Sequence, residues 1–175
     1  MGQGILDNAW KGYNATLFAY GQTGSGKSYS VIGYGANKGI VPILCEELFK
    51  AMGEKREGVT FEVKFSMLEI YNEVARDLLD AKSTNKKSGL KIRQHPKKGF
   101  YADGLKEHMV ASYDEIVAKM DEGTINRTVA STNMNATSSR AHTIVGISFI
   151  QKTKNNAGKE MAKGSTIYLV DLAGR

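Results

Sequence analysis

The stretch Gly21–Ser28, with the sequence GQTGSGKS, decides how the rest of the chain is understood. It matches the pattern G-x-x-x-x-G-K-S/T of a phosphate-binding loop. The apolar run at 17–20 precedes it and predicts a buried strand, and residues 29–32 can continue the first turn of a helix. A strand, a glycine-rich loop and a helix in this order are the context that a phosphate site requires. The sequence therefore predicts a nucleotide-binding fold.

Each residue type in this loop has a chemical reason to be there. Glycine lets the backbone take positive φ and approach a phosphate closely, so that successive N–H groups point at the anion. Lys27 is expected to reach the β- and γ-phosphates, and Ser28 to offer its hydroxyl to Mg²⁺. The alternative is a flexible glycine loop that contains a lysine by chance. We expect nucleotide contacts from Gly21, Gln22, Thr23, Gly24, Ser25, Gly26, Lys27 and Ser28.

The composition is ordinary for one soluble globular domain. The chain has 175 residues, of which 41% are hydrophobic and 24% charged. A net charge of +6 mildly favours an acidic partner, and nucleic acid, acidic protein surfaces and anionic lipid all qualify. Cys45 is the only cysteine, which excludes an intrachain disulfide and indicates a reducing compartment. It lies in an apolar helical pattern and is expected to be inert core. No run approaches the roughly 18 apolar residues of a membrane span.

Apolar periodicity predicts an alternation of helices and strands. Helices are expected at 5–11 and 40–49, and a third begins at the capping box formed by Ser112 and Glu115 and ends or kinks at Gly123. Strands are expected at 59–71, 90–93, 100–101, 144–150 and 167–170. The remaining polar or glycine-rich segments are expected to be turns or loops: 33–39, 72–79, 124–142 and 151–163. For 72–79, a short helix is the alternative.

Residues 80–99 are the one stretch that resembles a charged tract. The default interpretation of its lysines and arginine is a solvated loop, and the alternative is a contact surface for an acidic partner. No aromatic residues alternate with the charges, which argues against a single-strand nucleic-acid binder. The three histidines, His95, His108 and His142, are scattered and are expected to be surface or capping residues rather than metal ligands.

Asp171 follows the last apolar strand, which is where a P-loop fold holds Mg²⁺, usually through water. Gly174, three residues later, is placed to offer a backbone N–H to the γ-phosphate. The Asn- and Ser-rich loop before the 144–150 strand supplies a candidate sensor of the nucleotide. In that loop the hydroxyl of Ser138 or Ser139 would face metal or phosphate, and Arg140 would face charge.

Four segments together resemble the motor domain of a kinesin: AYGQTGSGKSYS (19–30), LEIYNEVARDLL (68–79), NMNATSSRAH (133–142) and LVDLAGR (169–175). They occur in the family's order and span nearly the whole chain. Within the family, HPKKGFYADGL (95–105) is most similar to the third class, which transports organelles and vesicles. The resemblance implies an α/β fold of the P-loop NTPase type. This fold is a three-layer sandwich with a central mixed sheet flanked by helices, here expected to be truncated at both ends.

The resemblance also implies an ATP-driven microtubule motor with ATP and Mg²⁺ as cofactors. Its partners would be microtubules, and a cargo or adaptor bound through a tail outside this chain, without nucleic acid or direct membrane insertion. The location would be the cytoplasm, on the microtubule cytoskeleton. The basic stretch 86–98 falls where the family has a loop that touches tubulin, whose acidic surface suits the charge.

Residue by residue, the resemblance implies two switches around the phosphate loop. Switch I corresponds to Asn135, Ser138, Ser139 and Arg140, with Ser139 near Mg²⁺ and Ser138 near the attacking water. Switch II begins with Asp171 and Gly174. Tyr29 occupies a position that the family often places near the adenine.

Two departures from the family's motifs are visible. Ala141 replaces a serine of the switch I motif S-S-R-S-H, and Arg175 stands at the serine of D-L-A-G-S-E. The glutamate expected to pair with Arg140, and the main microtubule-binding helices, fall outside residues 1–175. We therefore expect a central part of a motor domain (1–175, P-loop through the start of switch II) that hydrolyses ATP poorly alone.

Three other functions remain open at this point. The first is a nucleotide- or tubulin-binding module that does not cycle. The second is a GTPase switch, although residues 85–88 lack the aspartate of the guanine-reading N-K-x-D pattern. The third is a nucleic-acid-driven ATPase, although no acidic pair follows the last strand.

Overall fold

The computed structural model describes residues 2–22, 24–34, 37–54, 58–80, 89–96, 99–133, 140–154 and 158–174. Its helices are α1 (Gly2–Lys11), α2 (Lys27–Val31), α3 (Ile40–Gly53) and α5 (Tyr113–Asn133). The strands of the main sheet are β1 (Ala15–Ala19), β4 (Val59–Tyr71), β5 (Val74–Asp77), β8 (His108–Val110), β9 (His142–Lys154) and β10 (Glu160–Asp171). Two small hairpins pair β2 (Gly33–Tyr34) with β3 (Asn37–Lys38), and β6 (Lys91–His95) with β7 (Gly99–Asp103).

Among the described residues, the main sheet has six strands and is mixed. Its order is β1-β10-β9-β4-β5, and β8 also pairs with β4. Only β1 and β10 are parallel, with Ala19 in register with Asp171, whereas the other pairs are antiparallel. The carboxyl ends of two parallel neighbours lie at the same edge of a sheet. The glycine-rich loop that follows β1 therefore comes next to the end of β10.

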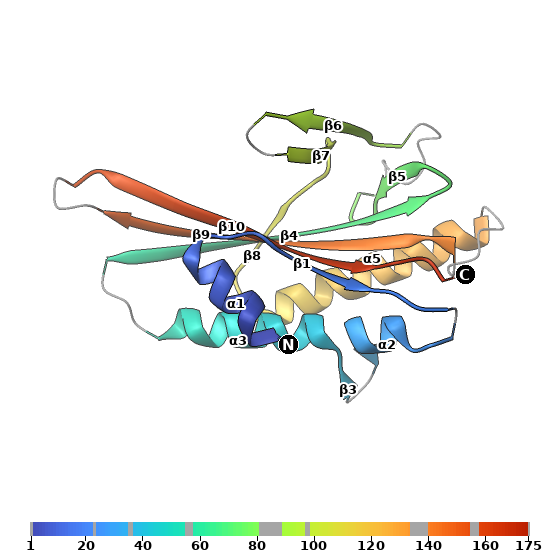
Figure 1. Ribbon diagram of the computed structural model, residues 1–175, viewed down its shortest axis with the longest axis horizontal. Coiled ribbons are helices and arrows are strands. Elements are labelled where there is room, and N and C mark those ends of the chain that lie inside the picture. Colours follow the sequence, from blue (N-terminus) through green and yellow to red (C-terminus); the bar gives the residue numbers. More distant parts are fainter. Residues whose placement is uncertain are drawn as a thin grey trace.

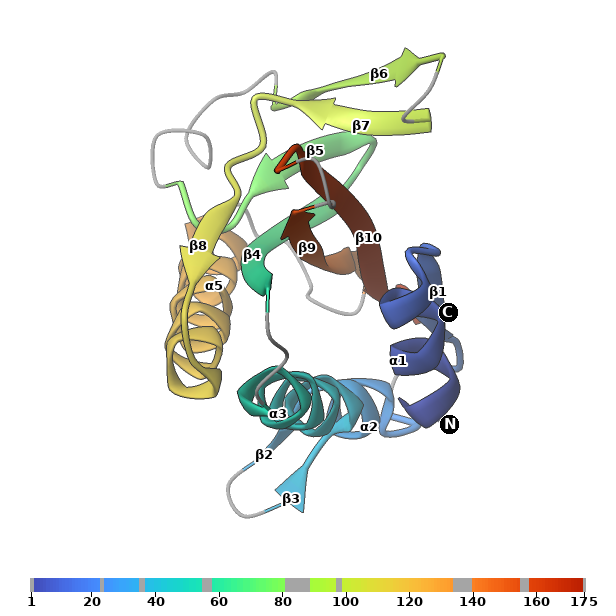
Figure 2. The same ribbon diagram turned by 90° about the vertical axis from the view of Figure 1, so that its left-hand side faces the viewer.

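The described helices cover one face of this sheet, and the β6–β7 hairpin stands over the other (Figures 1 and 2). The core lies between the sheet and the helices, and its large, fully buried side chains include Phe65, Phe149, Leu44, Leu48 and Ile116. The predicted α/β class, with a mixed central sheet flanked by helices, is confirmed. Cys45 lies in this core, where burial raises the pKa of its thiol to about 12. No helix among the described residues is long and apolar enough to cross a membrane.

Three of the predicted loops contain strands. Residues 74–77 form β5, and residues 33–34 and 37–38 form the β2–β3 hairpin. The hairpin predicted at 151–163 is present as the antiparallel pair of β9 and β10, but the bounds of its loop are wrong because β9 continues to Lys154 and β10 begins at Glu160. Backbone pairing does not require apolar side chains, and an ion pair between Glu62 and Lys152 joins β4 to β9 in this polar part.

The predicted end of the helix at Gly123 is also wrong, because α5 runs through it to Asn133. Two polar residues after Gly123 form side-chain hydrogen bonds without interrupting the helix. Thr124 donates its hydroxyl to the carbonyl of Met120 at 2.8 Å, and Asn126 donates its amide to the carbonyl of Leu78 at 2.7 Å. Residues 124–133 are therefore helical although their composition is polar.

The predicted capping of α5 by Ser112 and Glu115 is present in part, because the return contact of Glu115 goes to Ala111 and not to the N–H of Ser112. The Glu115 N–H donates to Ser112 Oγ at 3.2 Å. In return Glu115 Oε2 accepts the N–H of Ala111 at 2.8 Å. The two contacts satisfy backbone donors that have no partner inside the helix, which fixes where α5 begins.

Candidate functional site

The glycine-rich loop connects β1 to α2, as the sequence predicts. Gly26 caps α2 with φ +85°, and Gly24 has φ +83°, both in the left-handed region that favours glycine. The Ser25 N–H donates to the Gln22 carbonyl at 3.2 Å, which closes the loop on itself. The described part of the loop, residues 21–22 and 24–28, is thus a tight turn at a helix start.

Lys27 is directed back over this turn. Its Nζ donates to the Gly21 carbonyl at 2.8 Å and to the Gln22 carbonyl at 2.9 Å. An ammonium carries three donors, so a further N–H remains for an anion in the loop. The contacts hold a positive charge where the sequence predicts phosphate.

Ser28 and Asp171 are 143 residues apart in the chain and meet in the structure. Ser28 Oγ donates to Asp171 Oδ2 at 2.5 Å. The contact follows from the parallel pairing of β1 with β10, because α2 starts beside the end of β10. Two of the three residues predicted for the metal site are therefore brought together, and the third, Ser139, lies outside the described residues.

The oxygen atoms at this point suit a hard divalent cation. Asp171 is 6% exposed, and its Oδ1 atom is buried without a hydrogen-bond partner in the described part of the chain. Buried polar atoms are normally paired, so an orphaned carboxylate oxygen indicates a missing ligand or water. Mg²⁺ prefers oxygen ligands and keeps several waters. The Ser28 hydroxyl and the Asp171 carboxylate therefore fit Mg²⁺ held partly through water.

The segment after Asp171 is held by backbone hydrogen bonds on both sides. The Leu172 N–H donates to the Ala19 carbonyl at 3.1 Å, toward β1. The Ala173 N–H donates to His142 Nδ1 at 2.9 Å, toward β9. Gly174 follows directly and is half-buried. The sequence predicts His142 as a surface or capping residue and does not predict its contact with the turn after Asp171.

The other predicted site residues fall into two groups. Arg140 is exposed, and Tyr29, on α2, has 49% of its surface exposed, so both side chains are accessible from solvent. The remaining predicted residues lie outside the described part of the chain: Thr23, Asn135, Ser138 and Ser139.

A buried ion pair between α5 and β4 is not predicted by the sequence. Arg127 Nε lies 3.3 Å from Glu69 Oε1, and both side chains are largely buried. Burial raises the pKa of Glu69 above its ordinary value of 4.5, while the positive charges of Arg127 and Arg76 oppose the rise. The one available signal was an acidic residue in the apolar second half of β4.

This raised pKa predicts a pH dependence of stability. A raised pKa means that the folded state holds the Glu69 proton more tightly than the unfolded state. The contribution of Glu69 to the free energy of unfolding should therefore be largest below about pH 4.5 and fall as the pH rises through the folded pKa. Glu69→Gln removes this titration while keeping the shape. In urea unfolding at a series of pH values, the free energy of unfolding of the variant should rise relative to that of the wild type as the pH increases. A difference between the two free energies that does not change with pH would contradict a raised pKa of Glu69.

The β6–β7 hairpin carries the described part of the predicted basic stretch. Lys91 and Arg93 are exposed on β6, and Arg93 Nε pairs with Asp103 Oδ2 at 2.7 Å across the hairpin. The base of the hairpin is fixed by the buried Asp77, whose Oδ2 accepts the N–H of Lys106 at 2.9 Å. Lys82, Lys86, Lys87, Lys97 and Lys98 lie outside the described residues.

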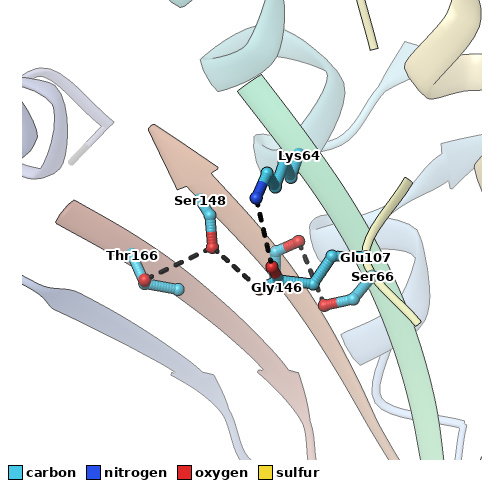
Figure 3. Close-up of polar contacts among 6 residues, drawn as sticks. All are labelled: Lys64, Ser66, Glu107, Gly146, Ser148 and Thr166. Atoms are coloured by element: carbon cyan, nitrogen blue, oxygen red, sulfur yellow. Dashed lines mark hydrogen bonds and ion pairs between the residues drawn. The ribbon is translucent and has the colours of Figure 1, made fainter. Parts of the chain in front are cut away.

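The sheet face beneath this hairpin has a polar centre (Figure 3). Ser148 donates to Glu107 Oε1 at 3.3 Å and lies 3.4 Å from the Thr166 hydroxyl. Lys64 Nζ approaches Glu107 Oε2 at 3.9 Å. Burial, and secondarily the charge of Glu107, raise the pKa of Tyr168 on the same face. This cluster joins β4, β9, β10 and the segment before β8.

Comparisons with known proteins bear on the family of the chain. The family model described as the kinesin motor domain matches residues 1–175. The human kinesin-like protein KIF28P is 53% identical over 173 residues, which are 99% of this chain and 17% of that protein. Kinesin-related protein 1 of Dictyostelium discoideum is 49% identical over 179 residues, covering 99% of this chain and 8% of that protein.

A solved structure described as that of a fast kinesin matches with a TM-score of 0.88 and 38% sequence identity. The match covers 98% of this chain and 48% of that one. The chain therefore spans about half of the matched structure and less than a fifth of the curated relatives.

Proposed function

The chain belongs to the kinesin motor-domain family, and from this premise we propose that it forms the nucleotide-binding part of an ATP-driven microtubule motor. The observation that carries the proposal is the contact between Ser28 and Asp171, beside the loop that Lys27 covers. These three side chains are the cation, hydroxyl and carboxylate that phosphoryl transfer on a P-loop requires.

Each group has a separate part in the proposed reaction. The loop backbone and the Lys27 ammonium bind and orient the phosphates, and Tyr29 offers an accessible ring to the adenine. Ser28 and Asp171 would hold Mg²⁺, which when bound neutralises charge on the transferred phosphoryl group. Gly174 would offer its N–H to the γ-phosphate. Asn135, Ser138, Ser139 and Arg140 are proposed to respond to the nucleotide as switch I.

The proposed partner is the microtubule, with cargo or an adaptor bound elsewhere in the whole protein, and the proposed location is the cytoplasm. The exposed cations on β6 support a contact with an acidic protein surface such as that of tubulin. The fast kinesin's published description mentions an ATPase mechanism and interactions with microtubules, which supports the same function here. Membership of the third kinesin class stays a prediction.

The test is phosphate release by the full-length protein with MgATP, measured with and without microtubules. We expect release that microtubules stimulate, and Lys27→Ala should remove the stimulated release because the phosphates lose their cation. Microtubule binding without turnover in the wild type would instead establish a binding module that does not cycle. Turnover unaffected by Lys27→Ala would place the nucleotide elsewhere.

A further inference from the structure

The side chain of His142 contacts the backbone two residues after Asp171. We propose that His142 is a positioning residue: its Nδ1 atom fixes the turn from Asp171 to Gly174 by holding the Ala173 N–H. The inference deepens the proposed function and rests on it for the role of that turn in catalysis.

The contact lies where the strand ladder ends. Thr143 of β9 is the last residue in register with β10, opposite Asp171. Successive N–H groups of an extended chain point to opposite sides. The Leu172 N–H accordingly reaches β1, at the Ala19 carbonyl, and the Ala173 N–H turns toward β9. The backbone of β9 offers no further ladder partner there, and the His142 side chain takes its place.

The chemistry of the contact fixes the state of the ring. An imidazole nitrogen accepts a hydrogen bond only when it carries no proton, so the Nδ1 atom is the acceptor of a neutral ring whose proton sits on Nε2. His142 is half-buried, and the contact holds the Leu172–Ala173 peptide, which comes directly before the peptide that carries the Gly174 N–H. The backbone between Asp171 and Gly174 is therefore held at two points, by Ala19 at Leu172 and by His142 at Ala173.

His142 also links the segment proposed as switch I to the segment proposed as switch II. It is the last residue of NMNATSSRAH (133–142), and Ala173 belongs to LVDLAGR (169–175). A side chain of the first segment therefore sets the backbone of the second. A displacement at the start of β9 would be transmitted to Ala173 through one hydrogen bond.

Two substitutions in the full-length protein separate the acceptor from the bulk of the side chain. Asn keeps an acceptor atom attached to Cγ, where histidine has Nδ1, although it is smaller. Leu fills the space without an acceptor. The primary measurement is hydrogen–deuterium exchange of single amides, with Leu172 as the internal control because its hydrogen bond goes to Ala19. The second measurement is MgATP turnover.

We expect His142→Leu to speed exchange at Ala173 roughly 2- to 10-fold, the loss of one hydrogen bond, with Leu172 unchanged. His142→Asn should stay close to wild type in exchange, and turnover should fall with Leu and recover with Asn. Equal exchange at Ala173 in all three proteins, or Asn as impaired as Leu, would overturn the inference. His142→Ala replaces Leu if the Leu variant does not fold. A wild type without turnover would refute the proposed function, whereas exchange would still decide the role of His142.

Discussion

Replacing Asp171 by asparagine is expected to lower Mg²⁺-dependent ATP turnover on the order of 10- to 100-fold. The substitution keeps the size of the side chain but removes the negative charge. It also replaces one carboxylate oxygen, either the Oδ2 that accepts from Ser28 or the orphaned Oδ1, by an NH₂ group. An NH₂ group is a donor only and cannot face a cation. The Mg²⁺ concentration needed for half-maximal turnover should rise accordingly.

The control is the same substitution at Asp121, an exposed residue of α5. Asp121→Asn should leave the dependence of turnover on Mg²⁺ unchanged. This result would show that the effect of Asp171→Asn comes from the charge at that position and not from the loss of one negative charge in general. Thermal unfolding without nucleotide should show Asp171→Asn to be no less stable than wild type, since a buried carboxylate is exchanged for a neutral group. Unchanged turnover and Mg²⁺ dependence in Asp171→Asn would show that the metal is held elsewhere.

The sequence predicted the order of strand, loop and helix at this site, whereas several of the elements around it were predicted wrongly. The loop at 21–28 is a local pattern in which residue types at fixed spacing have a direct chemical meaning, and its geometry agrees with the prediction. The contact of Ser28 with Asp171 depends instead on the parallel pairing of β1 and β10. No local pattern encodes which strands become neighbours, so only the motifs of a known family indicated that the two residues share a site.

The errors have a common physical origin. Polar composition predicts loops at 124–142 and 151–163, yet α5 occupies residues 124–133, β9 extends to Lys154 and β10 begins at Glu160. Helices and strands need paired backbone groups, and tertiary contacts decide whether polar side chains interrupt them. The same assumption concealed the ion pair of Arg127 with Glu69, because a loop offers no fixed partner to a buried acid.

Gly123 provides the clearest test of such a tertiary contact. A Cβ atom at this position would lie 2.4 Å from the sulfur of Met67, whose side chain is 1% exposed in the core. We expect Gly123→Ala to reduce the free energy of unfolding by about 1–3 kcal/mol, the usual cost of overpacking a core. Higher helix propensity offsets at most about 1 kcal/mol of this loss. Urea unfolding of the purified variants measures the difference.

Gly4→Ala is the matched control, because Gly4 also lies in a helix, but in the described part of the chain its would-be Cβ meets nothing within 4 Å beyond its chain neighbours and the backbone of its own helix. The same substitution should therefore stabilise the protein at Gly4 and destabilise it at Gly123. Combining Gly123→Ala with Met67→Val, which removes the sulfur, should recover part of the loss, since contacting residues are not additive. Stabilisation by Gly123→Ala, or strict additivity with Met67→Val, would refute a packing role.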